Sequence, residues 1–178
     1  YWDLKQVSVK SQFKLFKKYD KFKEDDYIKL KKMCDFYNIE FLSTPFDINS
    51  ALFLNKLVKF FKIASADLTN LMLIDAVCKI GKPIILSTGA SKIQEIKYIN
   101  NYINKKFPKI ELALLHCVLS YPTKDEDAHL ELIGFLKKNF KSRLIGYSDH
   151  TMPDSHGIVL LEAYKKGAQI IEKHFTLD

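Results

Sequence analysis

The sequence predicts an α/β protein whose strands form an incomplete (β/α)8 barrel, the TIM-barrel architecture, with about six βα units. Three observations predict it. From Ile39 onward, short apolar β-branched runs alternate with stretches of helical periodicity. Runs such as residues 84–86 and 112–115 are apolar without interruption, which is typical of parallel strands buried on both faces. Every run also ends in polar residues, and this suits a barrel, where all strand ends meet at one mouth.

Each expected strand is a short apolar run that closes on small polar or ionisable residues. In chain order the strands are residues 39–44, 60–65, 83–88, 110–117, 143–148 and 169–174. Their polar ends, in the same order, are Ser43-Thr44, Ser65 with Asp67, Ser87-Thr88-Gly89, His116-Cys117, Ser148-Asp149-His150, and Glu172 with His174. In an open doubly wound sheet, ligand groups gather mainly at one switch point, so six polar ends favour the barrel.

Each expected helix is a stretch with apolar residues at 3.6-residue spacing. The helices between the strands are residues 49–58, 71–80, 92–105, 128–139 and 155–166. Before the first strand, residues 12–37 read as one or two lysine-rich helices. A complete barrel needs eight strands, so we expect the first two strands to be missing. No Pro/Gly linker divides the chain, which predicts a single partial barrel domain over residues 1–178.

Composition favours a cytoplasmic protein that binds neither nucleic acid nor membrane. The net charge is +7, but the lysines come as pairs spread along amphipathic helices, which is typical of a solvated outer face. Nucleic-acid binders concentrate such charge among exposed aromatic residues. No apolar stretch reaches the roughly 18 residues that cross a bilayer, and the first residues do not read as a signal peptide. Three scattered cysteines predict reduced thiols rather than disulfides or a thiolate zinc site.

One strand end predicts an anion site. The strand of residues 83–88 opens through Gly89 into a helix, where Ser91 and Gln94 form a capping-box pattern. Backbone N–H groups at a helix start, together with the hydroxyls of Ser87 and Thr88, suit a phosphate or a carboxylate. An ordinary βα turn with a helix cap is the alternative.

Two lysines raise the question of a cationic group in the site. Lys82 begins its strand. It could face solvent, contact an anion or form a Schiff base, and the spacing does not separate these three alternatives. Lys62 lies inside an earlier strand. A lysine in a buried strand needs a partner or a function, because burying an unpaired charge is unfavourable.

Two histidines at consecutive strand ends predict a metal site. His150 ends one expected strand and His174 the next, so the two would be neighbours in a barrel. Alternation places Ser148 with His150 on one face, and Glu172 with His174 on one face. Two imidazoles at an open mouth, without a thiolate, suit a labile Mn, Fe, Co or Zn ion. Two hydrogen-bonded strand-end histidines are the alternative.

The remaining polar candidates carry weaker signals. Ser120 and Tyr121 lie on the loop after the fourth expected strand, where the tyrosine either binds a sugar hydroxyl or packs over the barrel rim. His116 lies in an apolar strand and is expected to be buried and hydrogen-bonded. His129 and His156 are expected at the surface.

Seven segments stand out along the chain, and they read FLSTPFD (41–47), KIASAD (62–67), GKPIILSTG (81–89), LHC (115–117), SYPT (120–123), GYSDHT (146–151) and EKHFT (172–176). In this order and spacing they resemble the N-acetylneuraminate synthase family, which includes legionaminic and pseudaminic acid synthases. The similarity covers about residues 12–178.

The resemblance implies a reaction in which phosphoenolpyruvate condenses with N-acetylmannosamine or a related 2-acetamido sugar, giving a nine-carbon 2-keto sugar acid and phosphate. It implies that His150 and His174 hold a divalent metal, with Mn²⁺ the expected ion, which would act as a Lewis acid on the sugar aldehyde. By the same resemblance Lys82, Ser87 and Ser148 contact phosphoenolpyruvate. The substrate-binding set also includes Ser65, which lies in another matching segment.

The expected catalytic residues are Tyr121 and Glu172. By resemblance Tyr121 lies on the sugar side of the site. Glu172 faces the same way as His174, from which we infer that it is a base or a residue that orients the metal ligand. Ser120 is expected to bind substrate, and because some family members carry a different small polar residue there, the choice of sugar stays open.

Family members begin with two further strands and end with an antifreeze-like domain that covers the sugar across a homodimer; we expect both parts to be absent here and the full-length protein to be a homodimer. An opened barrel has unpaired edges, which predicts self-association of the chain. Two other functions stay open. One is an aldolase-type barrel enzyme that uses Lys82 or Lys62 covalently, and the other is a non-catalytic interaction module.

Overall fold

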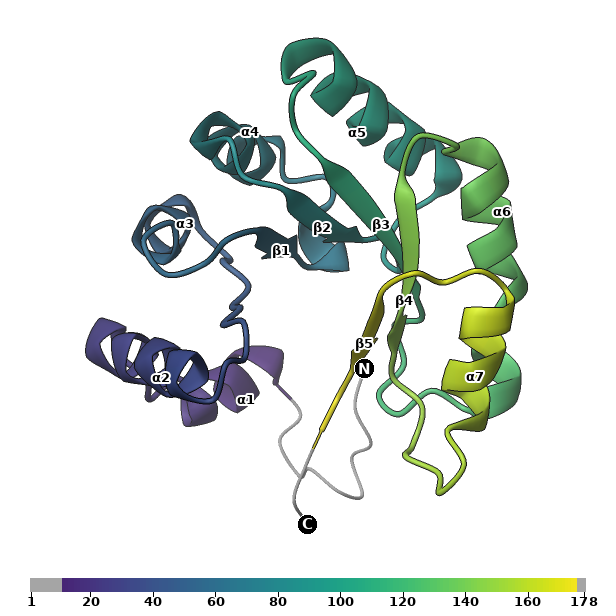
Figure 1. Ribbon diagram of the computed structural model, residues 1–178, viewed down its shortest axis with the longest axis horizontal. Helices are drawn as coiled ribbons and strands as arrows, with labels where there is room; N and C mark the ends of the chain where they lie inside the picture. The colour runs from purple at the N-terminus through teal and green to yellow at the C-terminus, as the bar shows by residue number, and fades with distance from the viewer. Residues whose placement is uncertain (1–10, 176–178) are drawn as a thin grey trace.

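The computed structural model describes residues 11–175, which form a curved sheet of five parallel strands (Figure 1). The strands pair in chain order, and they are β1 (Phe61–Ile63), β2 (Ile84–Ser87), β3 (Leu112–Cys117), β4 (Leu144–Asp149) and β5 (Ile171–Lys173). Because each strand pairs with the next one in sequence, the sheet has no switch point. The barrel prediction is therefore confirmed over a doubly wound sheet, with five strands and not six.

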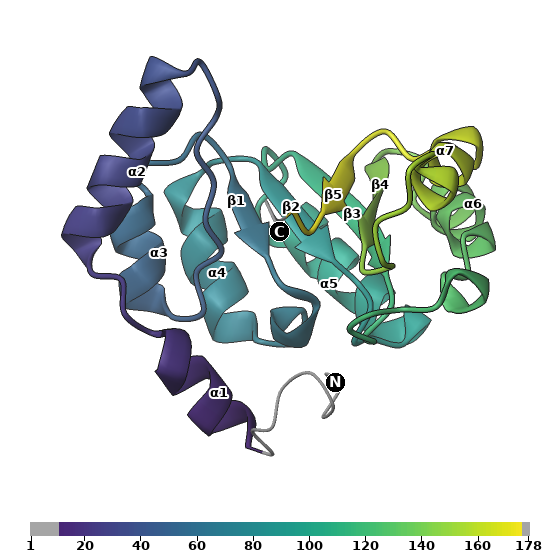
Figure 2. The same cartoon turned by 90° about the horizontal axis from the view of Figure 1, so that it is seen from below.

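The helices form an arc around the outer face of the curved sheet, as Figures 1 and 2 show. They are α1 (Gln12–Tyr19), α2 (Glu24–Phe36), α3 (Ile48–Leu54), α4 (Leu71–Ile80), α5 (Ile93–Lys106), α6 (Glu131–Asn139) and α7 (Ile158–Lys165), with short 3-10 turns η1 (Ser65–Asp67) and η2 (Asp125–Asp127). Two of them fall in the lysine-rich region where one or two helices are expected. Within residues 11–175, no helix has the length and apolar character needed to span a bilayer.

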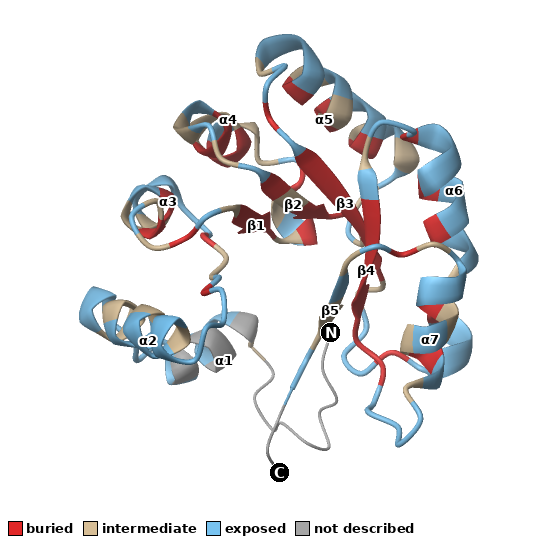
Figure 3. Cartoon of the chain, viewed as in Figure 1, coloured by how far each residue is buried: buried red, intermediate tan, exposed pale blue. Residues whose placement is uncertain are grey.

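The core lies between the sheet and the helices. In β1, Phe61 and Ile63 are almost fully buried against the helical layer, while Lys62 between them points to the inner face. In α3 to α7 the buried residues lie on the side of each helix that faces the strands, whereas α2 has no buried residue (Figure 3). α4 shows why these helices form where they do: the side chain of Asn70 accepts a hydrogen bond from the N–H of Leu73 at its start, and Gly81 ends it with φ +86°.

The register brings the polar strand ends to the same level. Ser87 pairs with Leu115, Cys117 pairs with Ser148, and Ser148 pairs with Glu172. β4 approaches the chain entering β5 very closely at Gly146. A Cβ atom there would lie 2.4 Å from the carbonyl oxygen of Ile170, so only glycine fits.

The segment 39–44, predicted as the first strand, is not a strand, and this expectation was wrong. Phe41 is buried, but Ile39 and Leu42 are exposed, and the sheet described in residues 11–175 begins at β1. Local β propensity does not make a strand without a neighbouring strand to take its N–H and C=O groups. The other expected strands are present but are shorter at one or both ends.

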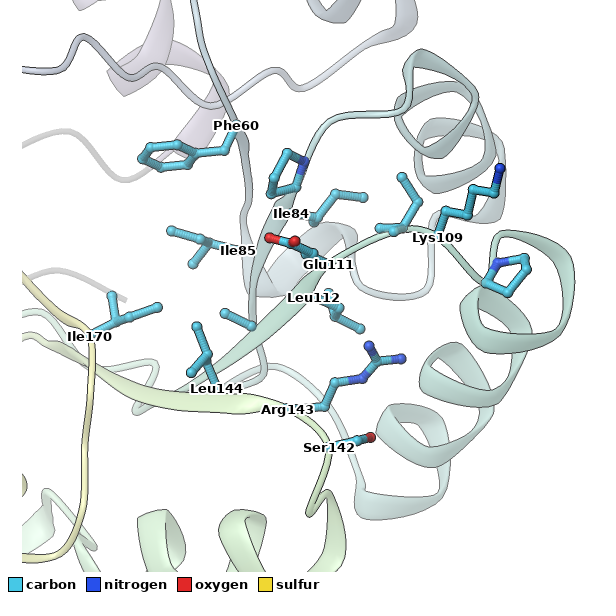
Figure 4. A pocket seen from close by; sticks show the side chains of 14 residues that line it. Phe60, Ile84, Ile85, Lys109, Glu111, Leu112, Ser142, Arg143, Leu144 and Ile170 are labelled. Atoms are coloured by element: carbon cyan, nitrogen blue, oxygen red, sulfur yellow. The ribbon is translucent and has the colours of Figure 1, made fainter.

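An apolar pocket of about 450 Å³ lies at the amino-terminal ends of the strands. Phe60, Ile85, Leu144 and Ile170 point into the same space from different strands and strand entries (Figure 4). This end of the curved sheet is opposite to the polar strand ends, so the pocket is separate from the residues expected to carry chemistry.

Candidate functional site

Polar side chains from four strands meet at the carboxyl ends of the sheet, on its inner face. Lys62 of β1 is only 7% exposed, and its Nζ donates a hydrogen bond to Ser87 Oγ of β2 at 2.8 Å. The same ammonium lies 3.4 Å from Glu172 Oε2 of β5. Glu172 Oε1 in turn accepts a hydrogen bond from Ser148 Oγ of β4 at 2.8 Å. The result is a continuous polar chain, Ser87–Lys62–Glu172–Ser148, across the open side of the curved sheet.

Lys62, and not the predicted Lys82, lies among the polar strand ends. Lys82 precedes β2 at its amino-terminal end, where its Nζ donates to the carbonyl oxygens of Asn55 at 2.5 Å and Val58 at 2.7 Å. It therefore satisfies carbonyl groups that follow α3, and the structure does not bring it to the polar strand ends. The sequence already marks Lys62 as a lysine in an otherwise apolar strand that needs a partner or a function, but it does not include Lys62 among the expected site residues.

His150 and His174 lie side by side, with ring centroids 5.4 Å apart. Tyr121 packs against both rings, at 4.1 Å from His150 and 5.8 Å from His174. Burial raises the pKa of Tyr121, so its hydroxyl stays protonated and able to donate a hydrogen bond. The structure therefore brings together the two predicted metal ligands and one predicted catalytic residue.

The imidazole of His150 is held in one tautomer. Its Nδ1 lies 2.6 Å from the carbonyl oxygen of Val118, and because a carbonyl only accepts hydrogen bonds, Nδ1 carries the proton. Burial lowers the pKa of His150, which favours the neutral ring. The lone pair is then on Nε2. Metal-binding histidines commonly have this arrangement, in which one nitrogen donates to a carbonyl and the other is free to ligate.

The donor set fits a metal in part. Two neighbouring imidazoles, one of them with a fixed tautomer, suit a divalent transition ion with open coordination positions. Across residues 11–175, however, three or more His, Cys, Asp or Glu side chains do not gather into a metal-binding group. Mn²⁺ binding stays a prediction.

Ser65 and Cys117 lie beside Lys62 at the same strand ends. Both are buried, and burial raises the pKa of the Cys117 thiol. Gly89 passes directly over this thiol, since a Cβ atom there would be 2.6 Å from Cys117 Sγ. Ser65 thus lines the site at its edge, next to the turn that follows β2.

Ser120 is exposed, and its hydroxyl donates to the carbonyl oxygen of Pro122 at 2.9 Å. It lies on the same loop as Tyr121, but this local hydrogen bond does not direct it toward the other candidates. The predicted capping box is also displaced by one residue. α5 begins at Ile93, and Lys92 N donates to Glu95 Oε2 at 2.7 Å in place of the Ser91–Gln94 pair.

The other histidines lie where they were expected. His116 is buried on the helix-facing side of β3, where its Nε2 lies 2.8 Å from the carbonyl oxygen of Ala128 and its ring stacks on Tyr147. His129 and His156 are exposed.

Comparison with known proteins gives a consistent result. The model of the NeuB family matches residues 1–178. The uncharacterized protein MJ1065 of Methanocaldococcus jannaschii is 42% identical over 174 residues, which are 97% of this chain and 50% of that protein. The N,N'-diacetyllegionaminic acid synthase of Campylobacter jejuni is 45% identical over 144 residues, which are 79% of this chain and 42% of that protein.

Solved structures agree with this similarity. A crystal structure of an N-acetylneuraminic acid (sialic acid) synthetase from Leptospira borgpetersenii, in complex with citrate, superposes with a TM-score of 0.82 at 39% identity. The alignment covers 88% of this chain and 53% of that one. The chain thus spans about half the length of the relatives that it matches.

Proposed function

This chain belongs to the NeuB family, and from that premise we propose that it carries the strand-end half of an active site that condenses phosphoenolpyruvate with a 2-acetamido sugar aldehyde. The product is a nine-carbon 2-keto sugar acid, and phosphate is released. The polar chain Ser87–Lys62–Glu172–Ser148 is the observation that supports this most directly. It joins a cation, a carboxylate and two hydroxyls at one strand-end face, next to two histidines.

Lys62 binds the anionic end of phosphoenolpyruvate. Its ammonium is buried and already fixed by Ser87 Oγ, so little conformational entropy remains to be lost when an anion arrives. Attraction between charges is stronger in a site shielded from water than at an exposed surface. Ser87 and Ser148 supply hydroxyl donors on either side.

Glu172 handles the proton of the attacking water. In the proposed reaction C3 of phosphoenolpyruvate bonds to the aldehyde carbon, whose oxygen takes up a proton. Water adds to C2 and gives one proton to Glu172. The C2–O bond to phosphate then breaks, the remaining hydroxyl proton passes to the departing phosphate, and C2 becomes the keto carbon. Ser148 Oγ, 2.8 Å away, holds the carboxylate in one orientation.

His150 and His174 would hold the divalent metal of the family, proposed to be Mn²⁺. When bound, such an ion supplies Lewis-acid polarisation of the sugar aldehyde. Tyr121, packed against both rings, presents its protonated hydroxyl on the same side and orients the sugar. Within the proposal the enzyme is cytoplasmic, and the full-length protein is a homodimer.

Phosphate release tests the proposal. The chain is incubated with phosphoenolpyruvate, N-acetylmannosamine and MnCl₂, and inorganic phosphate is measured against reactions that lack the sugar or contain EDTA. We expect release that requires both sugar and metal and is abolished by Glu172→Gln. Release that is absent, or that proceeds equally without the sugar, would overturn the proposal.

An imine-forming aldolase is the second candidate, because Lys62 is a buried lysine next to a carboxylate. Borohydride treatment in the presence of a keto substrate separates the two, since the condensation above forms no imine. Covalent trapping at Lys62 supports the aldolase. A chain that shows neither trapping nor phosphate release is the non-catalytic interaction module.

A further inference from the structure

A buried group on the opposite face of β4 and β5 links the two strands that carry His150 and His174. Asp149 and Lys173 are register partners, directly after the Ser148–Glu172 pair. Because side chains alternate along a strand, Asp149 and Lys173 project away from the face that carries the histidines. Asp149 is 1% exposed and the Lys173 side chain 22%, so neither is an ordinary surface charge.

Every hydrogen-bonding position of this pair is used. Asp149 Oδ1 accepts from Tyr147 Oη at 3.1 Å and from Thr151 N at 2.9 Å. Asp149 Oδ2 accepts from Thr151 Oγ1 at 3.0 Å and from Lys173 Nζ at 2.5 Å. Lys173 Nζ also donates to the carbonyl oxygen of Thr151 at 2.6 Å and lies 3.3 Å from its Oγ1. The carboxylate thus has its four acceptor sites filled, and the ammonium its three donors.

These hydrogen bonds restrain the backbone on both sides of His150. Asp149 and Thr151, the residues before and after it, are both tied to Lys173 of β5. The carbonyl of His150 itself accepts from Thr123 N at 2.8 Å, on the side of β3. On the β5 side, Lys173 is the residue immediately before His174, so the same ammonium also fixes where His174 leaves the strand.

An ion pair in which one partner is buried and the other partly buried is a poor choice for stability alone. Removing two charges from water costs about as much free energy as their attraction returns, and well-packed apolar residues often stabilise a protein equally well. What a saturated ion pair does supply is a single geometry, because its hydrogen bonds break if the strands slide or separate.

We infer that Asp149 and Lys173 are positioning residues, which set the spacing and orientation of His150 and His174 from behind the sheet. The inference rests on the proposed function in so far as the two histidines form a metal site. It names no contact with substrate. The geometry of the histidine pair depends on Asp149 and Lys173, whose side chains touch neither imidazole ring.

The test compares Lys173→Met with Lys173→Arg and with Lys165→Met. Lys165 on α7 also forms a close ion pair, with Glu162 at 2.7 Å, but on the exposed helical surface, so it is a matched control. Mn²⁺ and Ni²⁺ affinities are measured by titration calorimetry. We expect Lys173→Met to weaken binding by about tenfold, the arginine variant to recover part of the loss and Lys165→Met to change nothing.

A second measurement needs no metal. Imidazole resonances of ¹⁵N-histidine-labelled protein report the tautomer and environment of each ring, and His116 on β3 is the internal reference. We expect Lys173→Met to broaden or split the signals of His150 and His174 and to leave His116 unchanged. Should Lys173→Met not fold, Asp149→Asn, which keeps the shape of the carboxylate, replaces it.

The metal titration and the imidazole resonances distinguish a failure of the proposed metal site from a failure of the positioning role. An unaltered chain that binds neither ion contradicts the metal site of the proposed function, and the imidazole signals still decide the positioning role. Unchanged imidazole signals in a folded Lys173→Met chain overturn the inference, and so does unchanged metal affinity in a chain that does bind the ion.

Discussion

Lys62 lies within a strand and Lys82 lies just before one, and of the two only Lys62 points toward the candidate site. Alternation within β1 places Lys62 on the inner face, where it meets Ser87 and Glu172. Lys82 lies before β2 begins, so its long side chain turns to the carbonyl groups of Asn55 and Val58. The position of a lysine relative to the strand end therefore decides whether its ammonium reaches the polar strand ends or the carbonyl groups that follow α3.

This difference predicts opposite effects for the same substitution. Lys62→Met removes the buried cation, and we expect phosphoenolpyruvate binding to weaken by about 10- to 100-fold, the usual range for a charge-assisted hydrogen bond. Lys82→Met is expected to leave binding unchanged and to lower the free energy of unfolding by about 1–3 kcal/mol, because two carbonyl groups lose their donor. Calorimetric titration and urea unfolding of both variants measure the two effects. A loss of binding in Lys82→Met alone would return that residue to the site.

The same comparison shows how far sequence can predict a site. Strand alternation alone placed Ser148 and Glu172 on one face with the two histidines, and the hydrogen bond between Ser148 and Glu172 agrees with it. The structure places Lys62 and not Lys82 beside these residues, because the position of Lys82 depends on the carbonyl groups that follow α3. That information is tertiary, and no local pattern near Lys82 carries it.

At the scale of single elements, α4 and α5 are joined by one carboxylate. Asp75 of α4 accepts from Tyr102 Oη at 2.7 Å and from Lys106 of α5, and it pairs with Lys79 at 2.7 Å. These donors, Lys106 foremost, hold the pKa of Asp75 well below its usual range. A carboxyl group whose pKa is lower in the folded state stabilises the fold above its unfolded pKa.

Acid should therefore weaken this connection. The contribution of Asp75 is complete above about pH 5 and decreases as pH falls through the range below the unfolded value near 4. In Asp75→Asn we expect lower stability than in the unaltered chain at pH 7 and a shallower decline of stability between pH 5 and pH 2. Urea unfolding at a series of pH values measures this. Parallel pH curves for the two proteins would show that Asp75 carries no such linkage.

Alanine substitutions at two glycines, one in the sheet and one in a helix, test how tightly the sheet is packed. A Cβ at Gly146 of β4 would meet the backbone of Ile170 and the side chain of Leu115, whereas at Gly134 of α6 it would meet nothing within 4 Å. Gly146→Ala is expected to destabilise the protein by about 1–3 kcal/mol through overpacking. Gly134→Ala is expected to stabilise it by about 0.5–1 kcal/mol, since alanine is the better helix former. Thermal unfolding of both variants is the measurement, and equal midpoints would contradict the close approach at β4.

Element boundaries show a second limit of sequence prediction. The helices and the five strands follow from periodicity, because the pattern of buried side chains is imposed by each element itself. Residues 39–44 carry the same apolar signal as β1, and Phe41 is indeed buried. A strand, however, is defined by its hydrogen-bonded neighbour, and the presence of a neighbour is a property of the whole sheet.

At the scale of the whole molecule, the curved sheet leaves two edges. In residues 11–175 the strand order begins with β1 and ends with β5, and the outer side of each has no strand beside it. The apolar pocket at the amino-terminal ends of the strands adds further surface that water solvates poorly. Unpaired edges of a sheet are sites where a second chain can add its own strand.

We therefore expect the chain to self-associate, and the β5 edge allows a direct test. Ile171 of β5 is 42% exposed and Leu161 on the outer helix α7 is 51% exposed, so each accepts a lysine without disturbing the core. Charge on an edge strand opposes pairing between edges, whereas charge on an outer helix does not. In sedimentation velocity over a range of concentrations, Ile171→Lys should shift the chain toward its 20.7 kDa monomer and Leu161→Lys should not. An unaltered chain that sediments as a monomer at high concentration would show that the exposed edges do not drive association. An equal effect of the two lysines would instead place the contact outside β5.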